Sequence, residues 1–124
     1  MGAYGILGIA TAMGLLTLPA TARADGLAEV WARKPAYVIT SQRPIETLEM
    51  CIALAMSERA LPSSVHGKGE VIISTTLARA ADQLSQSVRI TELGDSRRIE
   101  VAAVKKIWKE SDEIKMVVEK CAIG

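Results

Sequence analysis

Two hydrophobic periods alternate along this chain, and each predicts a different kind of element. Residues 44–59 have apolar side chains at the three- and four-residue spacing of one helix face. These are Ile45, Leu48, Ile52 and Ala55. Pro44 suits a first helical turn, where a missing N–H costs nothing. We therefore expect the first main helix over 44–59, with Cys51 on the flank of its apolar face.

Residues 105–122 show the same helical spacing. One face of this second predicted helix carries Val104, Ile107, Trp108, Ser111, Ile114, Val118 and Cys121. The opposite face carries opposite charges four positions apart, as Lys106/Glu110, Lys109/Glu113 and Lys115/Glu119. Such pairs support a solvated helix surface. We interpret this charge run as a solvated face and not as a binding patch.

Residues 87–104 alternate instead with period two, on both sides of a tight turn. A two-residue turn at Gly94-Asp95, with glycine first, is typical of a β-hairpin. The register that this turn predicts places four pairs opposite each other: Val88/Val101, Arg89/Glu100, Ile90/Ile99 and Glu92/Arg97. Apolar and opposite-charge pairs coincide in this register, and such cross-strand pairs stabilise a hairpin.

The remaining segments give weaker patterns. Residues 70–77 read as a covered central strand, and 63–69 as a loop. Residues 36–40 form an extended stretch that either joins the sheet or stays outside it. Residues 78–86 fit a helical turn or a wide loop. Leu27, Val30 and Trp31 predict one or two helical turns within 25–34.

The N-terminus differs from the rest in charge. Arg23 is the only charged residue of 1–24, so the rest of the chain carries 14 of the 15 basic and all 14 acidic side chains. An apolar run followed by Ala22-Arg23-Ala24 predicts a cleavable signal peptide, with cleavage after Ala22 or Ala24. The alternative is an uncleaved anchor, although the run is shorter than the roughly 20 residues that cross a bilayer. We expect a leader (1–24), an N-terminal arm (25–43) and a domain (44–124).

Cys51 and Cys121 are the only two cysteines. An even number of cysteines behind an export signal predicts a disulfide, and two buried free thiols are the alternative. A bridge between the two predicted helices would hold both on one side of the sheet. We therefore expect a two-layer α+β fold, with a mainly antiparallel sheet of three to four strands and two helices packed on one face.

Charge and composition exclude several classes of function. The balanced charge of the segment after the leader argues against a nucleic-acid binder, which needs a basic excess. The chain has one histidine, His66. Too few further ligands accompany it to form a structural zinc site, so we expect no metal or cofactor. Lys68, between two glycines, lacks the remainder of a phosphate-binding loop. His66 and Lys68 form at most a loop site.

We therefore expect a periplasmic or secreted, non-catalytic binding domain of the bacterial envelope, without stable membrane insertion after cleavage. Its partner, an envelope protein or a small ligand, is unknown. The expected interaction surface is the sheet face away from the helices: Ile72, Thr76, Arg89, Thr91, Arg98 and Glu100. One alternative is a secreted inhibitor of a lytic or proteolytic enzyme. The other is a small hydrolase that uses His66.

Overall fold

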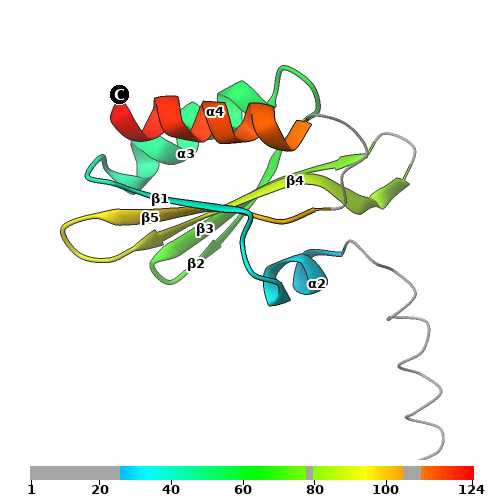
Figure 1. Ribbon diagram of the computed structural model, residues 1–124, viewed down its shortest axis with the longest axis horizontal. Helices are drawn as coiled ribbons and strands as arrows, with labels where there is room; N and C mark the ends of the chain where they lie inside the picture. The colour runs from blue at the N-terminus through cyan, green and yellow to red at the C-terminus, as the bar shows by residue number, and fades with distance from the viewer. Residues whose placement is uncertain (1–25, 78–79, 105–109) are drawn as a thin grey trace, which may run out of the picture.

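The computed structural model describes residues 26–77, 80–104 and 110–124, so the predicted leader lies outside the described residues (Figure 1). Within them, five strands form one antiparallel sheet in the order β1-β5-β4-β3-β2, flanked by three helices. The α+β class is confirmed. The expectation of three to four strands and two helices is wrong, because a further edge strand and a short third helix are present.

The elements have the following bounds. The strands are β1 (Tyr37–Ser41), β2 (Ser63–Gly67), β3 (Glu70–Leu77), β4 (Ala80–Glu92) and β5 (Arg97–Val101), and the helices are α2 (Leu27–Ala32), α3 (Ile45–Met56) and α4 (Glu110–Ile123). The first main helix ends three residues before the predicted bound. The start of the last predicted helix, 105–109, lies outside the described residues. None of the described helices combines the length and the apolar character needed to cross a membrane.

The β4–β5 hairpin has the predicted register. Its paired residues are Val88/Val101, Arg89/Glu100, Ile90/Ile99 and Glu92/Arg97, as expected. Gly94 has a φ of 103°, a backbone conformation that residues with a Cβ rarely adopt. The turn residues therefore fix the register, and the register decides which side chains of β4 and β5 share a face.

Three segments with weaker sequence patterns are strands in the structure. Residues 36–40 join the sheet, because β1 pairs with β5. The loop predicted over 63–69 is wrong, because β2 pairs with β3. All five residues of β2 are exposed, and an edge strand that is exposed on both faces shows no apolar alternation in its sequence. The helical turn or loop predicted over 78–86 is also wrong, because β4 begins at Ala80. Register shifts near Thr75 and Thr76 disturb the period there.

The main core lies between the sheet and the two long helices. Figure 1 shows α3 and α4 side by side on one face of the sheet. The core residues include Leu48, Ile52, Val71, Ile73, Val88, Ile90, Ile99, Val101, Ile114 and Val118. Cys51 and Cys121 form the predicted disulfide, with Cα atoms 5.8 Å apart, and so join α3 to the last turn of α4.

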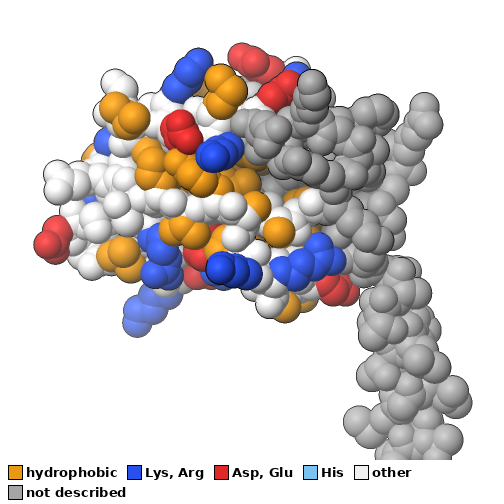
Figure 2. Space-filling model, viewed as in Figure 1, with side chains coloured by type: hydrophobic (Ala, Val, Ile, Leu, Met, Phe, Trp, Pro, Cys, Tyr) orange, Lys and Arg blue, Asp and Glu red, His pale blue; other side chains and the backbone are white. Residues whose placement is uncertain are grey.

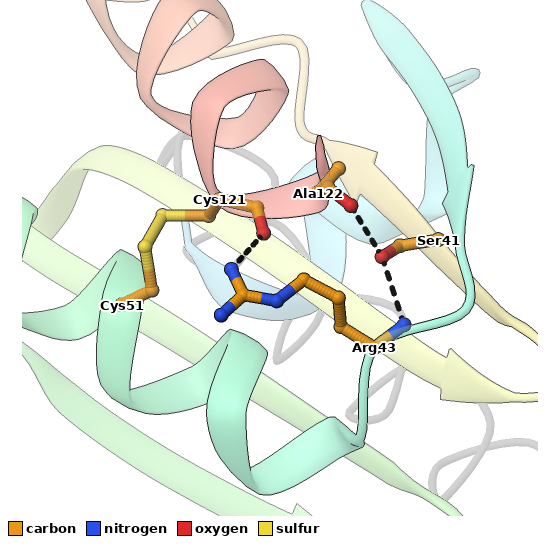
Figure 3. The surroundings of a disulfide bond; sticks show 5 residues. All are labelled: Ser41, Arg43, Cys51, Cys121 and Ala122. Carbon is orange, nitrogen blue, oxygen red and sulfur yellow. Dashed lines mark hydrogen bonds between the residues drawn. A yellow bond between two sulfur atoms is a disulfide. The ribbon is translucent and has the colours of Figure 1, made fainter. Parts of the chain in front are cut away.

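The end of β1 and the segment between β1 and α3 cap the end of α4 (Figure 3). Arg43 donates a 2.7 Å hydrogen bond from Nη1 to the carbonyl oxygen of Cys121, and the Ser41 hydroxyl donates one of 2.7 Å to the carbonyl oxygen of Ala122. The last carbonyls of a helix have no partners within it, so these side chains supply them. The disulfide and the two caps fix the helix layer to β1.

The opposite face of the sheet carries α2 (Figure 1). Val30 of this helix forms a second, smaller core with Leu84 and Ala102, and Trp31 packs against it. The predicted helical turn is confirmed, and its apolar side covers the end of the sheet where β4 begins. No other helix of the described residues lies on this face.

Candidate functional site

The sheet face opposite α3 and α4, beside α2 and partly under its Trp31, is the candidate functional surface. We call it the open face, and it consists of Val38, Thr40, Val65, Glu70, Ile72, Arg89, Thr91, Arg98 and Glu100. The strand registers arrange these residues in two rows across the sheet. The first row runs Val38, Glu100, Arg89, Ile72 and Val65, with one residue from each strand in spatial order. The second row runs Thr40, Arg98, Thr91 and, on β3, Glu70.

The structure brings together five of the six residues predicted for the interaction surface. Ile72, Arg89 and Glu100 are neighbours in the first row, and Thr91 and Arg98 are neighbours in the second. The sixth residue, Thr76, pairs with Leu84 beside the irregular part of β3 and lies apart from the others.

Sequence reasoning missed Val38 and Val65, the two ends of the first row. Both are exposed, Val38 at 47% and Val65 at 57%. In an extended stretch over residues 36–40, Val38 and Tyr37 point to opposite sides. This alternation assigns Val38 to a face of the sheet only once β1 is known to join the sheet. The residues around Val65 carry no alternation, so nothing in the sequence located it.

A buried carboxylate lies at the centre of the open face. Glu100 is only 6% exposed, and its Oε1 atom accepts a 3.0 Å hydrogen bond from Nε of Arg89. Nε of Arg98 lies 3.6 Å from the same oxygen, beyond hydrogen-bond distance. Two guanidinium groups therefore share one carboxylate, and this group of three side chains carries one net positive charge.

The α2 helix holds Arg89 in place from its other side. The guanidinium carbon of Arg89 lies 4.5 Å from the ring centroid of Trp31, a cation–π contact. The Trp31 indole N–H donates a 3.0 Å hydrogen bond to Ser87 Oγ, which contacts Ser74 Oγ at 2.9 Å. Because Arg89 is stacked on Trp31 and bonded to Glu100, its position is fixed from two sides.

Within this group of three side chains, Arg98 carries the positive charge that Glu100 leaves unbalanced. It is 42% exposed, and Glu100 is its ion-pair partner among the described residues. Its Nε has no hydrogen-bond partner in the described part of the chain. Thr40 and Thr91, its neighbours in the second row, are small and uncharged. Figure 2 shows several Lys and Arg side chains along the lower side of the molecule, the side that carries α2. The open face thus offers a partly exposed cation, Arg98, to an acidic group.

His66 lies on β2 and not in the predicted loop, and the structure joins it to a helix. Its Nε2 atom lies 3.0 Å and 2.9 Å from the two carboxylate oxygens of Glu49 on α3. Ser64, on the same side of the strand, has no hydrogen bond to the imidazole in the described structure. Lys68 lies in the two-residue turn between β2 and β3. This arrangement fastens the edge strand to α3, and it does not assemble a serine–histidine pair.

A hollow of about 290 Å³ lies beside His66, between α3 and the β2–β3 turn. Its lining includes the carboxylates Glu46, Glu49, Glu70 and Glu92. Glu49 is engaged by His66, and Glu92 lies 2.8 Å from Nε of Arg97. Across the described ranges, no three His, Cys, Asp or Glu side chains are placed to hold a metal ion together. The hollow is thus a weaker candidate site than the open face.

No protein-family model and no curated protein matches this chain.

Proposed function

We propose that this chain is an exported, non-catalytic binding domain whose open face holds an acidic segment of another envelope protein. The observation that carries the proposal is the pairing of two guanidinium groups with one buried carboxylate, which leaves Arg98 as a spare, half-exposed cation. A partner carboxylate near Arg98 would complete the charge balance. Arginine suits this role because its planar fork binds carboxylates in a bidentate manner.

The proposal of export rests on the sequence and on the disulfide. Disulfides persist in oxidising compartments such as the periplasm and the extracellular space, so the Cys51–Cys121 bridge fits a periplasmic or secreted protein. The apolar stretch of 1–24, in which Arg23 is the only charged residue, supplies the proposed export signal. A rigid domain loses little conformational freedom on binding, which favours a role in recognition.

Site-specific photo-cross-linking in cells of the source organism tests the proposal. A photoreactive amino acid replaces Thr91 on the open face in one variant, and Met116, exposed on the helix layer, in a matched control. We expect one protein adduct at position 91, none at 116, and loss of the adduct when Arg98→Glu is added. Equal adducts at both positions, or an adduct at 91 that Arg98→Glu leaves unchanged, would contradict the proposal.

The identity of the adduct also decides between a binding domain and an inhibitor. Mass spectrometry of the cross-linked peptide is expected to find Asp or Glu next to the cross-linked residue. An adduct with a lytic or proteolytic enzyme, whose activity the domain then abolishes at an equal molar ratio, would make the domain an inhibitor.

A further inference from the structure

β2 is an edge strand with no further pairing strand among the described residues, and it lacks the features that usually protect such an edge. Natural edge strands avoid pairing with other chains by carrying lysine, proline or bulges. The five residues of β2 are Ser-Ser-Val-His-Gly, all are exposed, and the strand pairs regularly with β3. Pro62 and Lys68 flank the strand but lie outside these five residues.

The backbone groups that face this free edge follow from the hairpin geometry. Gly67 and Glu70 close the two-residue turn between β2 and β3, so they form a hydrogen-bonded pair. Backbone groups alternate in direction along a strand, and Val65 therefore bonds to β3. Ser64 and His66 direct their N–H and C=O groups to the free edge.

The other edge strand of the sheet, β1, is bonded to α4 through two side chains. The Tyr37 hydroxyl of β1 donates a 3.0 Å hydrogen bond to Glu119 on α4, and Ser41 is bonded to the end of the same helix. On β2, the corresponding link is His66 with Glu49. The links on both edge strands engage side chains, so they leave the edge-facing backbone groups in place.

We propose that β2 pairs antiparallel with β2 of a second copy of this chain, which joins the two sheets into one continuous sheet. The strand is complementary to itself about Val65. In the register centred there, Ser64 bonds to His66 of the partner subunit, and His66 bonds to Ser64 of the partner subunit. No like charges meet, because each imidazole lies opposite a serine.

The side chains on the open face support the same register. Val65 would lie opposite Val65 of the partner subunit in a non-hydrogen-bonded pair, where the side chains approach most closely. Because Val65 is already paired with Ile72, an apolar row of four side chains would cross the junction. The pairing would cover Val65, which is 57% exposed in the single chain. Branched side chains in adjacent cross-strand positions stabilise a sheet.

A cysteine placed at the proposed two-fold axis tests the pairing. In Val65→Cys the two thiols would face each other, and mild oxidation is expected to give a covalent dimer on a non-reducing gel. The matched control is Val38→Cys, an exposed valine in the same row on the opposite edge strand. Absence of the covalent dimer for Val65→Cys, or equal cross-linking of both variants, would overturn the proposal.

Two measurements without an added cysteine complete the test. Sedimentation over a concentration series is expected to show the mass doubling for the wild type and the monomer mass for Val65→Lys, which places like charges opposite each other. Amide exchange of Ser64 and His66 is expected to slow about tenfold or more between the dilute and the concentrated sample. A monomer at every concentration, or a dimer that Val65→Lys leaves intact, would overturn the proposal. Arg98→Glu is expected to leave the dimer unchanged. This variant therefore distinguishes a failure of the edge pairing from a failure of partner binding at the open face.

Discussion

Arg43 caps the backbone of the same residue, Cys121, whose side chain is bridged to α3. Its Nη1 atom donates a 2.7 Å hydrogen bond to the Cys121 carbonyl oxygen, 78 positions along the chain. Cys121 is therefore held twice, once covalently through sulfur and once through a charged hydrogen bond. Both restraints come from β1–α3, so this part of the chain fixes the helix layer over the sheet.

Arg43→Ala is expected to lower the free energy of unfolding by about 1.5–3 kcal/mol, the usual contribution of a hydrogen bond to a charged group. Urea unfolding checks this. The control is Arg59→Ala, which removes an exposed ion pair with Glu113 and is expected to cost less than about 1 kcal/mol. Equal losses for the two variants would contradict the role assigned to Arg43.

The Cys51–Cys121 bridge is expected to supply a large share of the stability. It closes a loop with a sequence separation of 70, and the chain-entropy argument gives roughly 4 kcal/mol for a loop of this size. We expect Cys51→Ser to lower the melting temperature by many degrees, and reductant to bring the wild type to the same value. Equal melting temperatures for the oxidised wild type and the variant would contradict this contribution of the bridge.

Arg89 and Arg98 are expected to differ in their effect on stability, although both lie beside Glu100. Arg89→Ala removes the hydrogen bond to a buried carboxylate and the stacking on Trp31, at an expected cost of about 1–3 kcal/mol. Arg98→Ala is expected to cost less than about 1 kcal/mol, because its side chain is half exposed. Chemical denaturation of both variants makes the comparison. A larger loss of stability for Arg98→Ala than for Arg89→Ala would show that Arg98 is structural and unavailable to a partner.

Tyr37 is expected to titrate above its ordinary value. Partial burial raises the pKa of Tyr37 above 10.0, and the Glu119 carboxylate that accepts its hydrogen bond raises the pKa further. The unfolded chain therefore ionises first, so the stability from this group is complete below pH 10 and is lost as the pH rises further.

Tyrosinate absorbance in an alkaline titration measures this shift. Tyr4→Phe leaves Tyr37 as the only tyrosine of the chain. Glu119→Gln is expected to move the pKa of Tyr37 back toward 10.0, whereas Glu113→Gln, on a distant turn of α4, leaves it in place. The same midpoint in folded and denatured protein would contradict the shift.

The elements that the sequence predicted well are those with one covered and one open face. The hairpin register followed from one turn, because Gly94 determines which residues pair and thereby brings Arg89 opposite Glu100. Burial on one side produces a period in the sequence, and α3 and β3 show it clearly. The disulfide was predicted from the number of cysteines together with the predicted export signal.

The parts that the sequence did not predict lack such a period. β2 is exposed on both faces, and the start of β4 lies beside a register shift, so neither alternates regularly. The stacking of Trp31 on Arg89 joins residues far apart in sequence, and no local pattern reports it. The open face was predicted through its three middle strands, β5, β4 and β3, and its ends at Val38 and Val65 emerged only with the complete strand order.

The affinity of the cross-linked partner for charge-reversal variants tests the central claim most directly. Isothermal titration compares the wild type with Arg98→Glu on the open face and with Lys120→Glu on the exposed side of α4. We predict that Arg98→Glu weakens binding about tenfold or more, because it places a carboxylate against the partner's acidic segment, and that Lys120→Glu changes it less than about twofold. Unchanged affinity for Arg98→Glu, or a larger loss for Lys120→Glu, would contradict the assignment of the binding surface to the open face.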